Sequence, residues 1–419
     1  MNIGKRIYVY RKIQQLTLVQ LAEDSMSVAH LSKIENGHRE PSSKVTQLIG
    51  TKLKLPPRFF YHYGSEDREI NYLLTQIHHF IIEDLEKAAP LLQMIDDNYY
   101  DSLSCVKQEV YFLLLKGAYL YKKGQLRQAD QLYEDFLLHY LTGEDPAAFP
   151  RLIKEAYYYF FGLHYYRSED YDHSLQNYHS YLKVAVSLPV KAAIHFNIAL
   201  LLKAKDHYER AIDYCSQALY YYEVLQQPKD QSMTYNLMGT IYKRLEDFEQ
   251  AMNYLNQGEE LALEAEDLSL TAQIYHNKAI LLRKQNHEAQ ALTYLEKTLS
   301  LKLQLNKNPS ITYHALCKNY LALDKPGEAL QAFQQAKLHV THEVDYYKLL
   351  DAFLDYYKLT RQHDLYVESL EECIDFFEQR EQMEFLKPLY KKLAQHYYEA
   401  GKYKRSSEFY QALTALLET

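Results

Sequence analysis

Aromatic and apolar side chains recur at helical spacing along this chain of 419 residues, of which 42 are tyrosine and none is tryptophan. A period of three to four residues is typical of a helix that buries one face. Only 12 glycines and 11 prolines are present, which leaves little material for β-turns. The pattern therefore predicts a nearly all-α protein in which the tyrosines pack between stacked helices.

From about residue 65 onward, a frame of small, aromatic and turn positions repeats along the chain. Each copy has a small residue and an aromatic residue or leucine on one helix, and small and aromatic positions on a second. The small residues of the second helix recur at intervals of 37 to 45 residues, at Ala129, Ser174, Ala211, Ala251, Ala291 and Ala329, then at Ser406 two repeats later. This frame resembles the tetratricopeptide repeat, whose usual period is about 34 residues. The longer interval predicts extended helices or longer loops.

The first 60 residues follow a different pattern. Thr17 with Gln20 three positions later is the spacing of a capping box, which would open a second helix. A short turn through residues 24–26 then leads to a third helix that runs from Ser27 to Gly37. In that helix Leu31 and Ile34 face inward, and the final Asn-Gly pair favours a left-handed helix end.

This stretch resembles the Cro/C1-type (XRE) helix-turn-helix family, whose usual core is Leu-Ser-Lys-Ile-Glu-Asn-Gly followed by Arg-Glu-Pro-Ser. The matching residues here are 31–37 and 39–42. The resemblance implies that the third helix enters the major groove of DNA, with His30 and Lys33 reading bases and with Arg11, Arg39 and Lys44 on phosphates. The whole predicted DNA-binding set is Arg11, Thr17, Gln20, Ser27, Val28, Ala29, His30, Ser32, Lys33, Arg39 and Lys44.

Charge separates the two parts of the chain. Residues 1–63 hold ten Lys or Arg against four Asp or Glu, whereas residues 64–419 hold 37 against 51. A basic head on an acidic body is the pattern of a DNA-binding module joined to something else, and it argues against the alternative of a bundle that docks on protein. We therefore predict a helix-turn-helix domain at 1–63, a linker at 64–69 and a repeat domain at 70–419.

The predicted architecture is an N-terminal helix-turn-helix bundle followed by a right-handed tetratricopeptide-repeat superhelix. Two segments, 70–107 and 344–379, fit the repeat frame less well and are interpreted as degenerate helix pairs. In such a superhelix the first helix of each pair lines an inner groove. Mapping the frame places cations near the ends of these helices, at Arg167, Lys203, Lys243, Arg244, Arg283 and Lys284.

Asparagines fall at neighbouring groove positions in three successive repeats, at Asn197, Asn236 and Asn277. An asparagine amide both donates and accepts, so a series of them can hold an extended peptide backbone whatever its sequence. Cations in the groove would bind a carboxylate, and aromatic side chains would form pockets at Tyr121, Tyr159, Tyr166 and Phe196. The alternatives are that the cations offset helix dipoles and that the asparagines bond neighbouring helices.

A Cro/C1-type head joined to a long tetratricopeptide body resembles the RRNPP group of peptide-sensing regulators of Gram-positive bacteria. This resemblance implies a cytoplasmic quorum-sensing transcription regulator that binds DNA and a short imported signalling peptide. A dimer or larger assembly reading a near-palindromic operator is expected. The competing hypothesis is that the repeat body mainly inhibits a response-regulator or phosphotransfer protein of the sporulation type, with DNA binding as a second, peptide-switched activity.

Enzymatic and membrane functions are not supported by the sequence. It contains no His-Glu-x-x-His, Gly-x-Ser-x-Gly or Cys-x-x-Cys motif and no glycine-rich phosphate loop, so we expect no enzyme activity, metal or cofactor. The four cysteines are far apart and are expected to be buried thiols of a reducing compartment. No signal peptide and no apolar run long enough for a membrane span are found.

Overall fold

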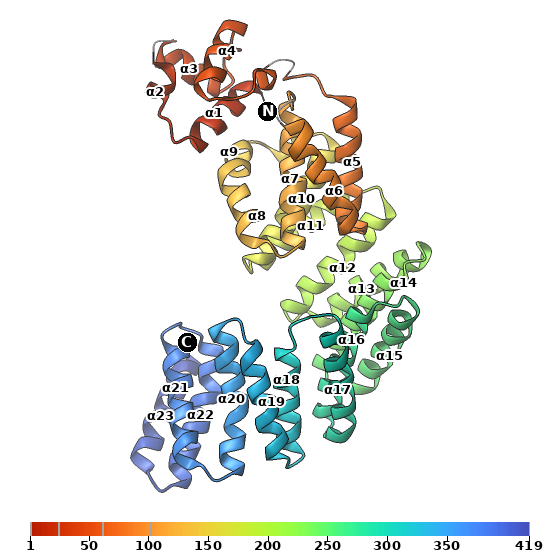
Figure 1. The fold of residues 1–419 in the computed structure, drawn as a ribbon, viewed down its shortest axis with the longest axis vertical. Coiled ribbons are helices and arrows are strands. Elements are labelled where there is room, and N and C mark those ends of the chain that lie inside the picture. The colour runs from red at the N-terminus through yellow and green to blue at the C-terminus, as the bar shows by residue number, and fades with distance from the viewer. Residues whose placement is uncertain (1, 24–25, 61–62, 101–102, 419) are drawn as a thin grey trace. The chain divides into compact units, whose positions relative to one another are not determined.

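The computed structural model describes residues 2–23, 26–60, 63–100 and 103–418, and every regular element in these ranges is helical. The helices form two compact units, Met1–Gln226 and Gln227–Thr419 (Figure 1). The expected fold class, a helix-turn-helix head followed by tetratricopeptide helices, is confirmed.

The head is a small helical bundle. Its elements are α1 (Ile3–Ile13), α2 (Leu18–Ala22), α3 (Val28–Glu35), α4 (Ser43–Lys52) and the short 3-10 helix η1 (Pro57–Phe60). Leu31 and Ile34 of α3 are fully buried in its apolar core, as expected. The core also requires Gly4, because a Cβ atom there would lie 1.8 Å from the carbonyl oxygen of Ile34. Helices α1 and α3 are therefore in close backbone contact.

The helix ends in the head follow the sequence signals. The capping box is present, since Thr17 accepts from the backbone N–H of Gln20 and the Gln20 side chain accepts from that of Thr17. Ser27 caps α3 and Gly37 follows it with φ of 74°. The expected turn begins at positions 24 and 25, which lie outside the described residues.

The remaining helices of the first unit form the first helix pairs of the array. They are α5 (Arg68–Glu83), α6 (Leu85–Met94), the π-helical turn η2 (Ile95–Tyr99), α7 (Val106–Lys122), α8 (Leu126–Leu132), the π-helical turn η4 (Tyr133–Leu137), α9 (Leu138–Leu141), the 3-10 helix η5 (Pro146–Ala148), α10 (Arg151–Arg167), α11 (Tyr171–Val184), α12 (Leu188–Ala204) and α13 (Tyr208–Val224). Because α5 begins at Arg68, the last two residues of the expected linker are helical.

The second unit consists of five further helix pairs. They are α14 (Pro228–Arg244) with α15 (Phe248–Glu264), α16 (Leu268–Lys284) with α17 (Glu288–Gln304), α18 (Ser310–Ala322) with α19 (Pro326–His339), α20 (Glu343–Leu359) with α21 (His363–Glu378), and α22 (Met383–Glu399) with α23 (Tyr403–Glu418). The two segments interpreted as degenerate repeats are indeed helix pairs, α5 with α6 and α20 with α21.

The small residues found by the repeat frame lie where paired helices touch. All seven small residues of the second helices are buried. At Gly162 an added Cβ atom would lie 2.4 Å from the ring of Tyr178, so the first helix of that pair requires glycine there. Ser174 donates to the carbonyl oxygen of Gly162 at 2.7 Å, and Ser406 donates to that of Ala394 at 2.8 Å. The same type of hydrogen bond thus joins the two helices of a pair in two distant repeats.

Extended helices account for the long repeat interval. Each helix from α12 to α17 has 17 residues, and short turns separate them. The turns contain residues with positive φ that are not glycine, such as Asp206 at 57° and Asn286 at 58°. Asn and Asp tolerate this left-handed conformation better than most residues. Glu, Gln and Arg adopt it at other turns, such as Glu246 and Gln226, so the described turns use few glycines.

Two further expectations concern the interior and the surface. Cys105, Cys215, Cys317 and Cys373 are all buried free thiols, as expected. Burial raises the pKa of Cys215 to about 12. Among the described helices, none combines the length and apolar character that crossing a lipid bilayer demands.

Candidate functional site

Helix α3 presents a polar outer surface suited to the major groove. Val28, Ala29 and Lys33 are exposed, while His30 and Ser32 are half-buried. The cap residue Ser27 and the two residues of the capping box on α2, Thr17 and Gln20, are exposed as well. The predicted reading residues therefore occupy one accessible side of the head, and the buried Leu31 and Ile34 occupy the inner side of α3.

Arg11 does not belong to that surface, and its assignment as a phosphate contact is wrong. Its side chain is 6% exposed and donates to both carboxylate oxygens of Glu35, from Nε and from Nη2, at 2.7 Å each. Its Nη1 donates to the carbonyl oxygen of Leu16 at 2.8 Å. The hydrogen bond to Glu35 raises the pKa of Arg11. This arginine holds α1 and α3 together, so it is unavailable to DNA.

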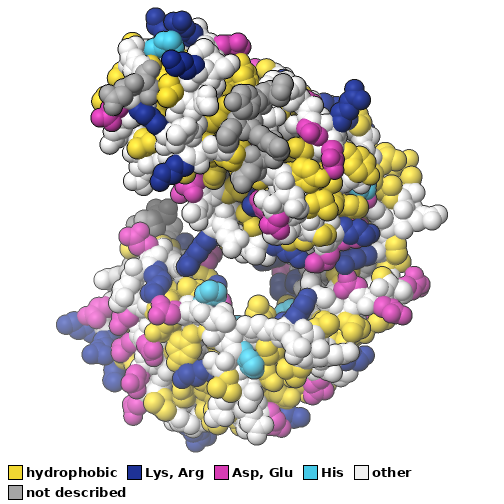
Figure 2. Space-filling model, turned by 45° about the horizontal axis from the view of Figure 1, so that its top comes forward, with side chains coloured by type: hydrophobic (Ala, Val, Ile, Leu, Met, Phe, Trp, Pro, Cys, Tyr) yellow, Lys and Arg dark blue, Asp and Glu magenta, His cyan; other side chains and the backbone are white. Residues whose placement is uncertain are grey.

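Enough cations remain on the head surface to bind a polyanion. Lys33, Arg39 and Lys44 are exposed, and Lys44 lies in the first turn of α4. A helix N-terminus favours a phosphate because its free backbone N–H groups point outward. Lys and Arg side chains are visible on the face of the head at the top of Figure 2.

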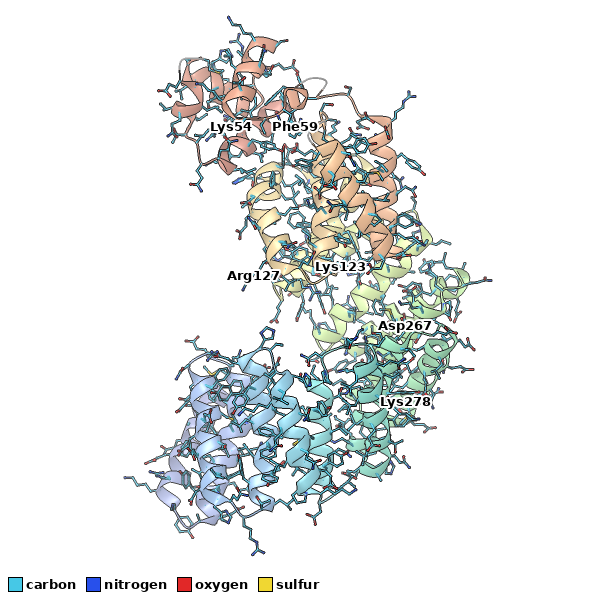
Figure 3. The ribbon with its side chains drawn as sticks, viewed as in Figure 1. Lys54, Phe59, Lys123, Arg127, Asp267 and Lys278 are labelled. Carbon is cyan, nitrogen blue, oxygen red and sulfur yellow. The ribbon has the colours of Figure 1, made fainter. Side chains whose placement is uncertain are left out.

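In the second unit, the first helices of neighbouring pairs contact each other and define what we call the inner face of that unit. Asn277 of α16 donates from Nδ2 to Oδ1 of Asn236 of α14 at 2.8 Å. Lys278, the next residue, is 1% exposed and instead donates to Asn256 and Glu259 of α15 (Figure 3). Because their hydrogen bond joins two neighbouring first helices, the asparagine pair lies on the inner face.

The three predicted asparagines do not share one position in the repeat. Asn197 and Asn277 stand two residues before the small residue of their helix, whereas Asn236 stands three before Gly239. His276 takes the position that corresponds to Asn236. Asn197 belongs to the first unit, where its side chain hydrogen-bonds the buried hydroxyl of Tyr178. The three asparagines therefore do not form the regular series expected from the sequence. Asn236 and Asn277 form a hydrogen-bonded pair, and Asn197 is separate from them.

Two of the four predicted aromatic pocket residues are interior. Tyr121 and Tyr159 are 1% and 2% exposed, so their assignment to ligand pockets is wrong. The hydroxyl of Tyr121 donates to Asp130 at 2.6 Å and lies 2.7 Å from Nδ1 of His164, which ties α7, α8 and α10 together. Tyr166 and Phe196 are half-buried and stay compatible with a ligand contact.

The predicted cations differ in exposure. Arg167, Arg244 and Lys284 are exposed, whereas Lys203, Lys243 and Arg283 are half-buried. Burial lowers the pKa of Arg283, and among the described residues no ion pair to it is found. A half-buried cation that has no ion pair favours an anionic ligand more than an exposed one does.

Arg283 lines a recess of about 690 Å³ on the inner face, which we call the basic recess. Its lining comes from three first helices, α16, α18 and α20: Arg283, Lys318, Leu321, Ala322, Asp355, Lys358 and Leu359. Lys318 is also half-buried, and burial lowers its pKa although Asp351 opposes the effect. The repeat frame does not select Lys318, because the cations that it selects lie near the ends of the first helices and Lys318 does not.

Two histidines lie on the same helices as the basic recess. Burial lowers the pKa of both His276 and His314 to about 4, so both are neutral near pH 7. Nδ1 of His276 and Nε2 of His314 are buried without a hydrogen-bond partner among the described residues. These neutral rings add no charge, so the positive charge of the basic recess comes from Arg283, Lys318 and Lys358, and Asp355 offsets part of it.

Known proteins match both parts of the chain. Residues 7–60 match the helix-turn-helix family, and residues 190–264 match the tetratricopeptide repeat family. The transcriptional activator NprA of Geobacillus stearothermophilus is 24% identical over 408 residues, which cover 93% of this chain and 97% of NprA. The chain is a homologue of NprA. The match to NprA spans the head as well as the repeats, and the resemblance to the RRNPP group is confirmed.

Two solved structures share the fold of this NprA homologue. The apo form of the quorum sensor NprR from B. thuringiensis has 18% identity and a TM-score of 0.69, covering 83% of this chain and 99% of NprR. NprR in complex with its cognate peptide NprX has 18% identity and a TM-score of 0.61, covering 84% and 100%. At this identity the likeness concerns the fold.

Proposed function

We propose that the protein is a quorum-sensing transcription regulator that binds DNA through α3 and a short signalling peptide on the inner face of its repeats. The head is a helix-turn-helix DNA-binding domain with an exposed α3 surface and exposed cations around it. Homology to a transcriptional activator along nearly the whole chain supports a regulatory role. We propose that two heads of a dimer read a near-palindromic operator, because one small head reads few base pairs.

The observation that carries the peptide proposal is the asparagine pair and the basic recess on one face. Asn236 and Asn277 each have one amide group in their mutual hydrogen bond, which leaves the other group of each amide for a peptide backbone. Arg283 lies further along α16 than Asn277, and Lys318 lies on the neighbouring first helix α18; both provide positive charge for a carboxylate. A peptide fixed by its backbone and by one anionic group suits such a face.

The test uses a synthetic pool of short random peptides. The full-length protein is immobilised, retained peptides are identified by mass spectrometry, and the best of them is resynthesised for calorimetry. We expect a saturable one-to-one complex that weakens when Asn277 is replaced by alanine. Retention of no peptide, or equal retention by the Asn277→Ala variant, would contradict the proposal.

The competing function, inhibition of a response-regulator-like protein by the repeat body, makes a different prediction. The repeat body would capture such a partner without any contribution from α3, whereas DNA binding requires α3. A pull-down with the wild-type protein and a Lys33→Ala variant, each with and without the selected peptide, therefore separates the two. Capture of a response regulator by both proteins, released by peptide, would favour the competing function.

A further inference from the structure

The head is joined to the first repeats by a buried ion pair. Arg6 of α1 and Glu109 of α7 are both completely buried, and Nε of Arg6 donates to Oε2 of Glu109 at 2.7 Å. The two residues are 103 positions apart in the chain. An ion pair without solvent is retained only where geometry and further hydrogen bonds compensate for desolvation, so its surroundings are informative.

The other hydrogen bonds of Arg6 also go to backbone carbonyl groups of the head and of the segment that precedes α7. Nη1 of Arg6 donates to the carbonyl oxygens of Phe59 at 2.6 Å and of Ser104 at 2.7 Å, and Nη2 donates to Leu103 at 3.0 Å. Phe59 belongs to the head, whereas Leu103 and Ser104 precede α7. Arg6 therefore joins the last turn of the head to the start of the repeats.

Glu109 is held from both sides as well. Tyr10 of the head donates to its Oε1 at 2.7 Å, and Tyr140 of α9 donates to its Oε2 at 2.7 Å. Tyr100 also donates to Oε1 at 3.3 Å, so the buried carboxylate accepts from an arginine and three tyrosines at once. A fully satisfied network of this kind is rigid, because moving any member leaves a buried polar group without a partner.

Aromatic contacts seal the network from solvent. The ring of Tyr10 meets those of Phe59 at 5.6 Å and Phe136 at 6.0 Å between centroids, both edge to face. Phe136 lies in the π-helical turn η4, and Tyr100, which contacts Phe59, directly follows the other π-helical turn η2. We call these residues, Arg6, Tyr10, Phe59, Tyr100, Glu109, Phe136 and Tyr140, the head–repeat interface.

The head–repeat interface reaches the recognition helix through α1. Arg6 and Tyr10 project from the same helix whose Gly4 contacts the backbone of Ile34 in α3. Arg11, also on α1, is paired with Glu35 of α3. Helix α1 is therefore fixed to α3 on one side and to α7 and α9 on the other.

We propose that Arg6 and Glu109 are positioning residues for DNA reading, which fix α3 relative to the first repeats and so determine the half-site spacing that a dimer accepts. This inference rests on the proposed function. A head on a free tether would adapt to several spacings, whereas a head fixed to the body reads the spacing that the body imposes. Neither residue touches DNA in this scheme.

The experiment compares full-length wild-type protein with a Glu109→Gln variant. Duplexes are selected from a random pool by wild-type protein and rebuilt with the spacer changed in single base pairs. Wild-type affinity should drop about tenfold when the spacing is wrong, and the variant should discriminate by only about twofold. Hydrogen exchange of residues 3–13 should accelerate in the variant.

The matched control is Glu35→Gln, which breaks the buried pair inside the head and leaves the head–repeat interface intact. It should lower affinity for all spacings and keep the wild-type preference. If Glu109→Gln fails to fold, Tyr140→Phe replaces it, since this change removes one donor without leaving a charge unpaired, and it should relax the preference in the same direction to a smaller extent.

The outcomes separate this inference from the proposed function. An unchanged spacing preference in the folded Glu109→Gln or Tyr140→Phe variant, together with faster exchange in α1, would overturn the positioning role. Absence of wild-type binding to any duplex would instead overturn DNA reading itself. In that case unchanged exchange of α1 in the Glu109 variant would also show that the head–repeat interface does not hold the head.

Discussion

Asn277 of α16 and Asn236 of α14 are joined by a hydrogen bond between their side-chain amides, with 2.8 Å between Nδ2 and Oδ1. The bond orients both amides, so that each offers its second group on the inner face. A peptide backbone that bonds these groups gains a preorganised partner, because little side-chain entropy remains to be lost. The pair therefore links packing within the repeats to ligand binding.

Replacing either asparagine by alanine should weaken binding of the peptide selected from the random pool by about five- to a hundredfold, or about 1–3 kcal/mol. The double variant should lose less than the sum of the single losses, because each single change also disorients the remaining amide. Calorimetry provides the affinities, and thermal melts should shift little. Additive losses would show that the hydrogen bond between the two amides has no role in binding.

Replacing Arg283 by glutamine should weaken peptide binding without destabilising the fold. The change removes a half-buried charge without an ion pair among the described residues, so unfolding should not become easier. Peptide affinity should nevertheless fall, and amidation of the peptide's carboxyl end should cause no further loss if that group occupies the basic recess.

Lys284→Gln is the matched control for Arg283→Gln, because it removes an exposed charge from the adjacent position of the same helix. Its effect should be small and should disappear as salt rises, since exposed charges are screened. Equal losses for the two variants would show that general electrostatic attraction, and not the basic recess, binds the anion.

The sequence predicted local features of the fold well. The capping box at Thr17 and the buried small residue at Ser174 depend on neighbours a few positions away or on the repeat frame, and both are visible in a single chain. Arg11 and Arg6 show the limit of such reasoning. Both count as positive charge in the head, yet Glu35 and Glu109 neutralise them in the interior, and the second partner is 103 positions distant.

The sequence predicts the candidate site less well, because it does not determine which side of a helix each side chain faces. A repeat frame assigns the helix but not the side that each residue faces, and a shift of one position rotates a side chain by about 100°. The frame therefore predicts Tyr121 and Tyr159 in ligand pockets, although both side chains are interior.

On DNA, Lys33→Ala and Lys44→Ala should behave differently. Lys33 lies on the outer side of α3, so its loss should cost about 1–3 kcal/mol on the selected duplex and little on random DNA. Lys44 lies at the start of α4, where a phosphate contact would weaken both DNAs alike. Gel-shift titrations measure both losses, and equal losses on the two DNAs for Lys33→Ala would refute its role as a base reader.

His78 should make stability depend on pH. Its ring is buried between the hydroxyls of Tyr111, 2.8 Å from Nδ1, and Tyr181, 3.0 Å from Nε2. Burial lowers the pKa of His78 to about 4 from an ordinary 6.5. The unfolded chain therefore takes up a proton at a higher pH than the folded one. Stability should be unaffected above the ordinary pKa and should fall as pH drops from about 6.5 towards 4, by about 2 kcal/mol near pH 5.

The measurement is urea unfolding of the wild-type protein and a His78→Gln variant at several pH values from about 7 down to about 5. Glutamine retains a donor and an acceptor for the two tyrosines but does not titrate in this range, so the pH dependence should become shallower. It should not vanish, because burial also lowers the pKa of His276 and His314 to about 4. A variant that loses stability as steeply as the wild type would show that His78 is not the titrating group.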